Sequence, residues 1–63
     1  MQISENIEIV ETSLGWIIKR TGLGGWVDYL SFHGVWYLQR GSAAFCHSPE
    51  RALVVLMENL LQQ

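Results

Sequence analysis

The sequence predicts an α+β fold, in which a small antiparallel β-meander of three to five strands precedes one C-terminal α-helix packed on one sheet face. Two observations support this prediction. Residues 48–63 combine a helix-start signal with an amphipathic pattern. The preceding residues form short runs of aromatic and β-branched side chains separated by Gly and Ser, as strands and turns do. No linker or internal repeat interrupts the chain, so we expect a single domain over residues 1–63.

The helix is predicted from its first residues. Ser48 can cap the first turn, Pro49 fits the first helical position, and Glu50 lies where the helix dipole favours negative charge. At about 100° per residue, most large aliphatic side chains share one arc, which we expect to be buried. These side chains are Leu53, Val54, Leu56, Met57, Leu60 and Leu61. The polar arc holds Glu50, Arg51, Glu58, Asn59 and Gln62, with Val55 in its middle.

Residues 4–12 have the mixed polar and apolar character of a half-exposed edge strand. If Ile7 and Ile9 face inward, Val10 faces outward and Glu11 inward. We therefore expect the strand to end at Val10 or to contain a bulge that resets the register.

A second strand is predicted over residues 16–20, after a turn at residues 13–15. Trp16 and Ile18 would share one face, and Ile17 and Lys19 the other. The sequence TGLGG over residues 21–25 then predicts a hairpin loop.

A third strand is predicted over residues 26–32 and a fourth over residues 35–40, joined by a turn at His33 and Gly34. One long strand bent at Gly34 is the alternative. Residues 43–46 could add a short last strand before the helix.

A sheet has two faces, and one helix covers only one of them. The chain is 49% hydrophobic and 16% charged, with three Trp, two Tyr and two Phe, so the uncovered face should present aromatic surface. A chain of 63 residues is also close to the size at which folding needs a staple or a partner. We therefore expect a homodimer or another protein to cover this face.

The chain has a net charge of −2 and lacks the basic stripe of nucleic-acid-binding proteins, so DNA and RNA are poor candidates for its binding partner. The single cysteine, Cys46, cannot form an internal disulfide, and the first residues lack the features of a signal peptide. These features favour the cytoplasm. No apolar run approaches the roughly 20 residues that span a bilayer, so we expect no membrane contact.

No motif for catalysis or for a cofactor is evident. The TGLGG sequence lacks the Lys-Ser/Thr pair and the following helix of a phosphate-binding loop. His33, Cys46 and His47 supply three zinc ligand types where a structural site needs four, and adjacent Cys46 and His47 would point to opposite faces. Cys46 as a nucleophile would need a cleft and an orienting group. We expect no enzyme activity, no metal and no cofactor.

The leading hypothesis is a non-enzymatic protein-binding module. Its predicted contacts are acidic side chains that would meet a basic partner, exposed tryptophans, and the valine in the polar helix arc. They are Glu5, Glu8, Glu11, Asp28, Trp26, Trp36 and Val55. The alternative is an antitoxin-like regulator associated with nucleic acid, with its basic residues grouped on one surface. Those residues are His33, Lys19, Arg20 and Arg40.

The chain also resembles small accessory proteins of tailed phages and prophages. The similar stretches are ISENIEIVE, GWIIKR, VWYLQR and the closing SPERALVVLMENLL. The resemblance lies in strand and helix order and covers most of the chain, and it carries over no functional residue. It implies a protein that binds and inhibits a host protein, such as a CRISPR effector, in the host cytoplasm.

Overall fold

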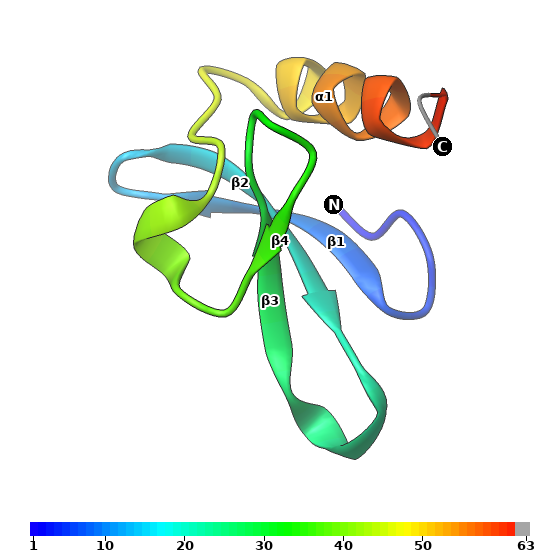
Figure 1. The fold of residues 1–63 in the computed structure, drawn as a ribbon. Coiled ribbons are helices and arrows are strands. Elements are labelled where there is room, and N and C mark those ends of the chain that lie inside the picture. Colours follow the sequence, from blue (N-terminus) through cyan, green and yellow to red (C-terminus); the bar gives the residue numbers. More distant parts are fainter. Residues whose placement is uncertain (62–63) are drawn as a thin grey trace.

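Four strands form one antiparallel sheet in the order β1-β2-β3-β4, and a single helix follows them (Figure 1). The computed structural model describes residues 1–61. The strands are β1 (Ile7–Thr12), β2 (Gly15–Thr21), β3 (Val27–Leu30) and β4 (Trp36–Tyr37), and the helix is α1 (Pro49–Leu61). Two short 3₁₀ turns, η1 (Leu23–Gly25) and η2 (Arg40–Ser42), lie in the connections. The predicted α+β meander with a C-terminal helix is confirmed.

β1 and β2 pair without interruption from Ile7 opposite Arg20 to Thr12 opposite Gly15. The prediction that the first strand ends at Val10 or bulges there is wrong. Glu11 shares the inward face with Ile9 but lies near the end of the hairpin, opposite Trp16. A charged side chain is tolerated at this exposed position, so the pairing needs no correction.

The outer edge of β1 is also paired. Gln2 forms a bridge with Glu8, and the amide of Ile9 donates to the carbonyl of Met1 at 2.7 Å. The amide of Ile3 donates to the carbonyl of Ile7 at 2.9 Å. Residues 1–3 therefore run along the strand that the sequence predicted as a free edge.

β3 and β4 form a hairpin, which excludes the alternative of one bent strand. The amide of Ser31 donates to the carbonyl of Val35, and the amide of Gly34 donates to the carbonyl of Ser31. Gly34 has φ +79°, which suits a three-residue hairpin loop. Both strands are shorter than predicted, because this turn already includes Ser31 and Phe32 and because η2 begins at Arg40.

Residues 43–46 return beside β2 but form only an isolated bridge between Cys46 and Trp16, not the predicted strand. The amide of Ala44 donates to the carbonyl of Leu30 at 2.9 Å. Gly15 is required at this crossing, because a Cβ on it would lie 2.7 Å from the carbonyl oxygen of Cys46. The crossing delivers the chain to α1 on one face of the sheet.

The core lies between this face and α1. Ile9, Ile18 and Leu30 are fully buried on the sheet, and they pack against Ala44, Cys46, Ala52, Val55 and Leu56. Ile7, Trp16, Trp36 and Leu53 complete the cluster at its margin. The other face contains Ile17, which is only 2% exposed, with Tyr29 half-buried and Tyr37 40% exposed. The predicted aromatic surface on that face is therefore only partly exposed.

The helix start is confirmed, since the hydroxyl of Ser48 accepts from the amide of Arg51 at 3.1 Å and Pro49 is the first helical residue. Residues 62–63 of the predicted helix lie outside the described residues. The predicted buried arc is largely wrong: Val54, Met57, Leu60 and Leu61 are exposed, while Val55 and Asn59 are buried.

The rotation of the helix has a steric reason. Ala52, which is fully buried, lets the helix approach the large side chains of Ile9 and Ile18 closely. Asn59 reaches the β3–β4 turn, where its Oδ1 would lie 2.7 Å from a Cβ on Gly34. Small contact residues, not the densest group of leucines, therefore determine which side faces the sheet.

Candidate protein-binding surface

The outer side of α1, facing away from the sheet, is apolar after its first turn, where exposed Glu50 lies on the same side. Val54, Met57, Leu60 and Leu61 are 40%, 53%, 58% and 83% exposed, at spacings of three and four residues that align them along the helix. We call these four residues the outer helix face. Covering a surface of large aliphatic side chains with another polypeptide lowers the free energy, so such a surface marks a candidate binding site. The helical pattern of the sequence had predicted that these side chains would be buried in the core.

Two charged side chains border the outer helix face along one side. Arg51 and Glu58 are both exposed, and at about 100° per residue they lie within about 60° of Val54 in the same direction around the helix. Among residues 1–61 the ion pairs are Lys19 with Glu8 and Arg20 with Asp28, so neither side chain has an ionic partner within that part of the chain.

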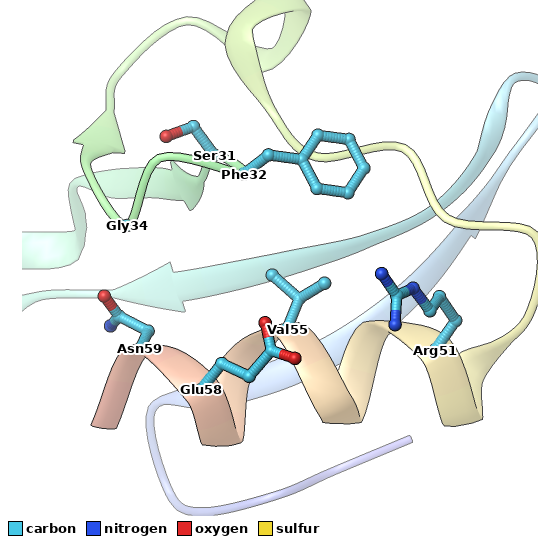
Figure 2. A pocket seen from close by; sticks show the side chains of 7 residues that line it. All are labelled: Ser31, Phe32, Gly34, Arg51, Val55, Glu58 and Asn59. Carbon is cyan, nitrogen blue, oxygen red and sulfur yellow. The ribbon is translucent and has the colours of Figure 1, made fainter. Parts of the chain in front are cut away.

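A small pocket lies between α1 and the β3–β4 turn (Figure 2). Its volume is about 70 Å³, and Phe32 lies on the turn side while Arg51, Val55, Glu58 and Asn59 line it from the helix. Phe32 is 61% exposed. The pocket is too small for a metabolite, and it extends the accessible surface from the helix onto the turn.

The predicted acidic patch is not one surface. Glu8 and Glu11 are three residues apart in β1, so they point to opposite faces of the sheet. Glu8 pairs with Lys19 at 3.7 Å, whereas Glu5 precedes the strand and is exposed. The physical reason is that an odd spacing in a strand separates side chains.

Asp28 is also removed from the predicted contact surface, because it is only 4% exposed. Its two carboxylate oxygens accept from Nε and Nη2 of Arg20 at 3.0 and 2.6 Å. The Cζ atom of the Arg20 guanidinium lies 4.1 Å from the centroid of the Trp36 ring and 5.7 Å from that of the Trp26 ring. Burial, a two-point contact and ring stacking together make this an internal structural cluster.

Of the predicted partner contacts, Glu5, Glu11 and Trp26 are exposed, and Trp26 is 47% accessible. Trp36 is half-buried beneath Arg20. Val55 is 7% exposed and points toward the β3–β4 turn (Figure 2), so the expectation that it is an exposed partner contact is wrong.

The basic residues proposed for nucleic acid do not gather. Lys19 and Arg20 are neighbours in β2 and therefore lie on opposite sheet faces. Arg20 is held by Asp28, Arg40 belongs to η2, and His33 lies in the β3–β4 turn. Nothing in this arrangement favours the antitoxin-like alternative.

Cys46 packs beneath the helix, at 3% exposure, and His47 is exposed. Burial raises the pKa of the Cys46 thiol above its ordinary value, and the positive charge of Arg51 opposes this only in part. The neutral thiol is thus favoured in the folded protein, which makes it a poor nucleophile.

We expect Cys46 to react with a disulfide reagent at pH 8 only as fast as the chain opens. Addition of denaturant should raise the labelling rate to that of a free thiol. Because its pKa is raised by folding, the contribution of Cys46 to stability should be complete below about pH 8.5 and decline as pH rises further. Cys46→Ala should lack that decline in urea titrations. Rapid labelling of the folded protein would contradict this placement.

Comparison of the chain with protein-family models, characterised proteins and solved structures finds no match. Within residues 1–61, no three His, Cys, Asp or Glu side chains group as a metal site would require. The same part of the chain has no helix long and apolar enough to cross a membrane.

Proposed function

We propose that this protein is a non-enzymatic protein-binding module whose contact surface is centred on the outer helix face. The observation that carries the proposal is the alignment of Val54, Met57, Leu60 and Leu61, all exposed, on one side of a helix whose other side already forms the core. An amphipathic helix normally places charge on that outer side. Covering it would remove apolar surface from water, which is the main driving force of most protein association.

The resemblance to small phage accessory proteins gives the proposal a biological form. In that form the protein occupies a surface of a larger host protein, such as a defence effector, and blocks it. Glu5 and Glu11 remain accessible as additional contacts, whereas exposed Trp26 directly follows η1 and lies away from α1. Charges at the rim of an interface mainly steer association.

We expect Met57→Glu to abolish partner binding without loss of the fold. Met57 is 53% exposed, and glutamate is a good helix former, so the change should affect the surface more than the core. The measurement is capture by tagged protein from a bacterial lysate, with the bound polypeptides quantified by mass spectrometry. Circular dichroism would verify that the variant is folded.

The matched control is Leu23→Glu. Leu23 is 96% exposed in η1, at the end of the sheet away from α1 (Figure 1), so the same apolar-to-charged change lies outside the proposed surface. We expect Leu23→Glu to retain every stoichiometric partner. Equal capture by Met57→Glu and the wild type would reject the outer helix face as the contact surface.

A further inference from the structure

The flank of the outer helix face carries one positive and one negative side chain, seven residues apart. Arg51 and Glu58 lie on the same side of Val54 and are separated by about 10 Å along the helix axis. The opposite flank is formed by Leu60, at the edge of the outer helix face, and by half-buried Leu53, and both are apolar. The helix therefore presents an apolar stripe with one charged border and one apolar border, and with exposed Glu50 at the N-terminal end of the stripe.

This arrangement is complementary to itself. When two identical helices pack antiparallel about a two-fold axis, each border of one helix lies beside the same border of the other. Arg51 of each copy then meets Glu58 of the second copy, and two opposite-charge pairs form. In a parallel pair the charged border of one helix would instead face the apolar border of the other, so Arg51 and Glu58 would have no opposite charge to pair with.

The same register also overlaps the two helices. Pairing Arg51 with Glu58 places the two-fold axis between Val54 and Val55, and the midpoint of Pro49–Leu61 is Val55. The helices would then face each other along almost their whole length. Val54 lies at the centre, and Met57 of each copy lies beside Leu53 of the other. Charge pairing and apolar overlap thus select one alignment.

We infer that the outer helix face binds a second copy of this chain, through an antiparallel α1–α1 contact bordered by two Arg51–Glu58 ion pairs. This inference rests on the protein-binding function proposed above and names a second copy as the occupant of the same surface when no host protein is bound. A contact limited mainly to one helix per copy lies at the small end of specific interfaces. We therefore expect a dimer that dissociates on dilution, with a dissociation constant in the micromolar range or above, at roughly 10⁻⁶ to 10⁻⁴ M.

The experiment is light scattering and analytical ultracentrifugation of the full chain over a wide concentration range. The wild type should move from 7.2 kDa toward twice that mass as concentration rises. Arg51→Glu places two glutamates opposite each other in both pairs, and Glu58→Arg places two arginines opposite each other. Each variant alone should dimerise about tenfold more weakly, since both attractive pairs become repulsive.

The decisive sample is an equimolar mixture of Arg51→Glu and Glu58→Arg. In an antiparallel heterodimer, the glutamate introduced at position 51 of one copy meets the arginine introduced at position 58 of the other. The second pair joins the unchanged Glu58 of the first copy to the unchanged Arg51 of the other. Both pairs are then attractive, so affinity should return to that of the wild type. The control Arg40→Glu makes the same charge change as Arg51→Glu at an exposed position outside α1 and should leave dimerisation unchanged.

The outcomes separate this inference from the proposed function. A wild type that stays monomeric at all concentrations overturns the second-copy inference, whereas loss of a captured host protein in Met57→Glu would still support the proposed function. A dimer whose two charge variants gain nothing on mixing overturns the antiparallel arrangement. Failure of both dimerisation and Met57-dependent capture rejects both.

Discussion

Val55→Asp is expected to unfold the protein, whereas the same change at the neighbouring Val54 is expected to be tolerated. Val55 is 7% exposed and packs in the core with Leu56 and Ala52. A carboxylate there would be buried without a partner, which should lower the free energy of unfolding by at least about 4 kcal/mol. A domain of this length has a total of only about 3–9 kcal/mol.

Val54→Asp is the control, because Val54 is 40% exposed on the outer side of the same helix turn. Its cost should remain below about 1 kcal/mol, since valine and aspartate have similar helix propensities. Urea titrations followed by circular dichroism would measure both variants. If Val54→Asp were the more damaging change, α1 would be rotated to the orientation that the leucine pattern predicted.

Arg20→Met is expected to have the second largest effect. It leaves the carboxylate of Asp28, whose side chain is 6% exposed, without its two hydrogen-bond donors, while the methionine keeps much of the contact with the Trp36 ring. Removing one partner of a largely buried pair should lower the free energy of unfolding by about 3 kcal/mol. Chemical denaturation of the variant and the wild type tests this value.

Lys19→Met provides the comparison within the same strand. Lys19 also forms an ion pair, with Glu8 at 3.7 Å, but both side chains are more than a third accessible, at 35% and 40%. Screening by water should limit the cost to less than about 1 kcal/mol. If the two variants lost the same free energy of unfolding, burial of Asp28 would not make its ion pair more important than the exposed one.

The sequence predicted element order better than it predicted which sides of the elements are buried. The cap at Ser48, the turns at glycine and the alternation in β2 are local signals, and each was confirmed. The rotation of α1 depends on how closely the helix can approach the sheet. Ala52 and the contact of Asn59 with the Gly34 turn determine that distance, and neither stands out in a pattern of large apolar residues.

The Arg20–Asp28 cluster shows how a loop displaced by one residue, which shifts the strand pairing by two residues, changes a predicted site. In the structure Thr21 pairs with Val27, so Arg20 lies opposite Asp28. A loop over residues 21–25, as predicted, would place Arg20 opposite Trp26. The pairing of Arg20 with Asp28 could therefore be predicted only if the first and last residues of the loop were known. Those residues depend on the pairing of the two strands, which local sequence does not determine.

Residues 1–3, which pair along the outer side of β1, limit the ways in which this sheet can associate. They occupy backbone groups over residues 7–9 that would otherwise template an added strand. At the other side of the sheet, β4 offers only two residues. Neither border is suited to β-augmentation or to growth of cross-β aggregates, so recognition by this protein should depend on side chains and resist fibril formation even at the concentrations that drive assembly.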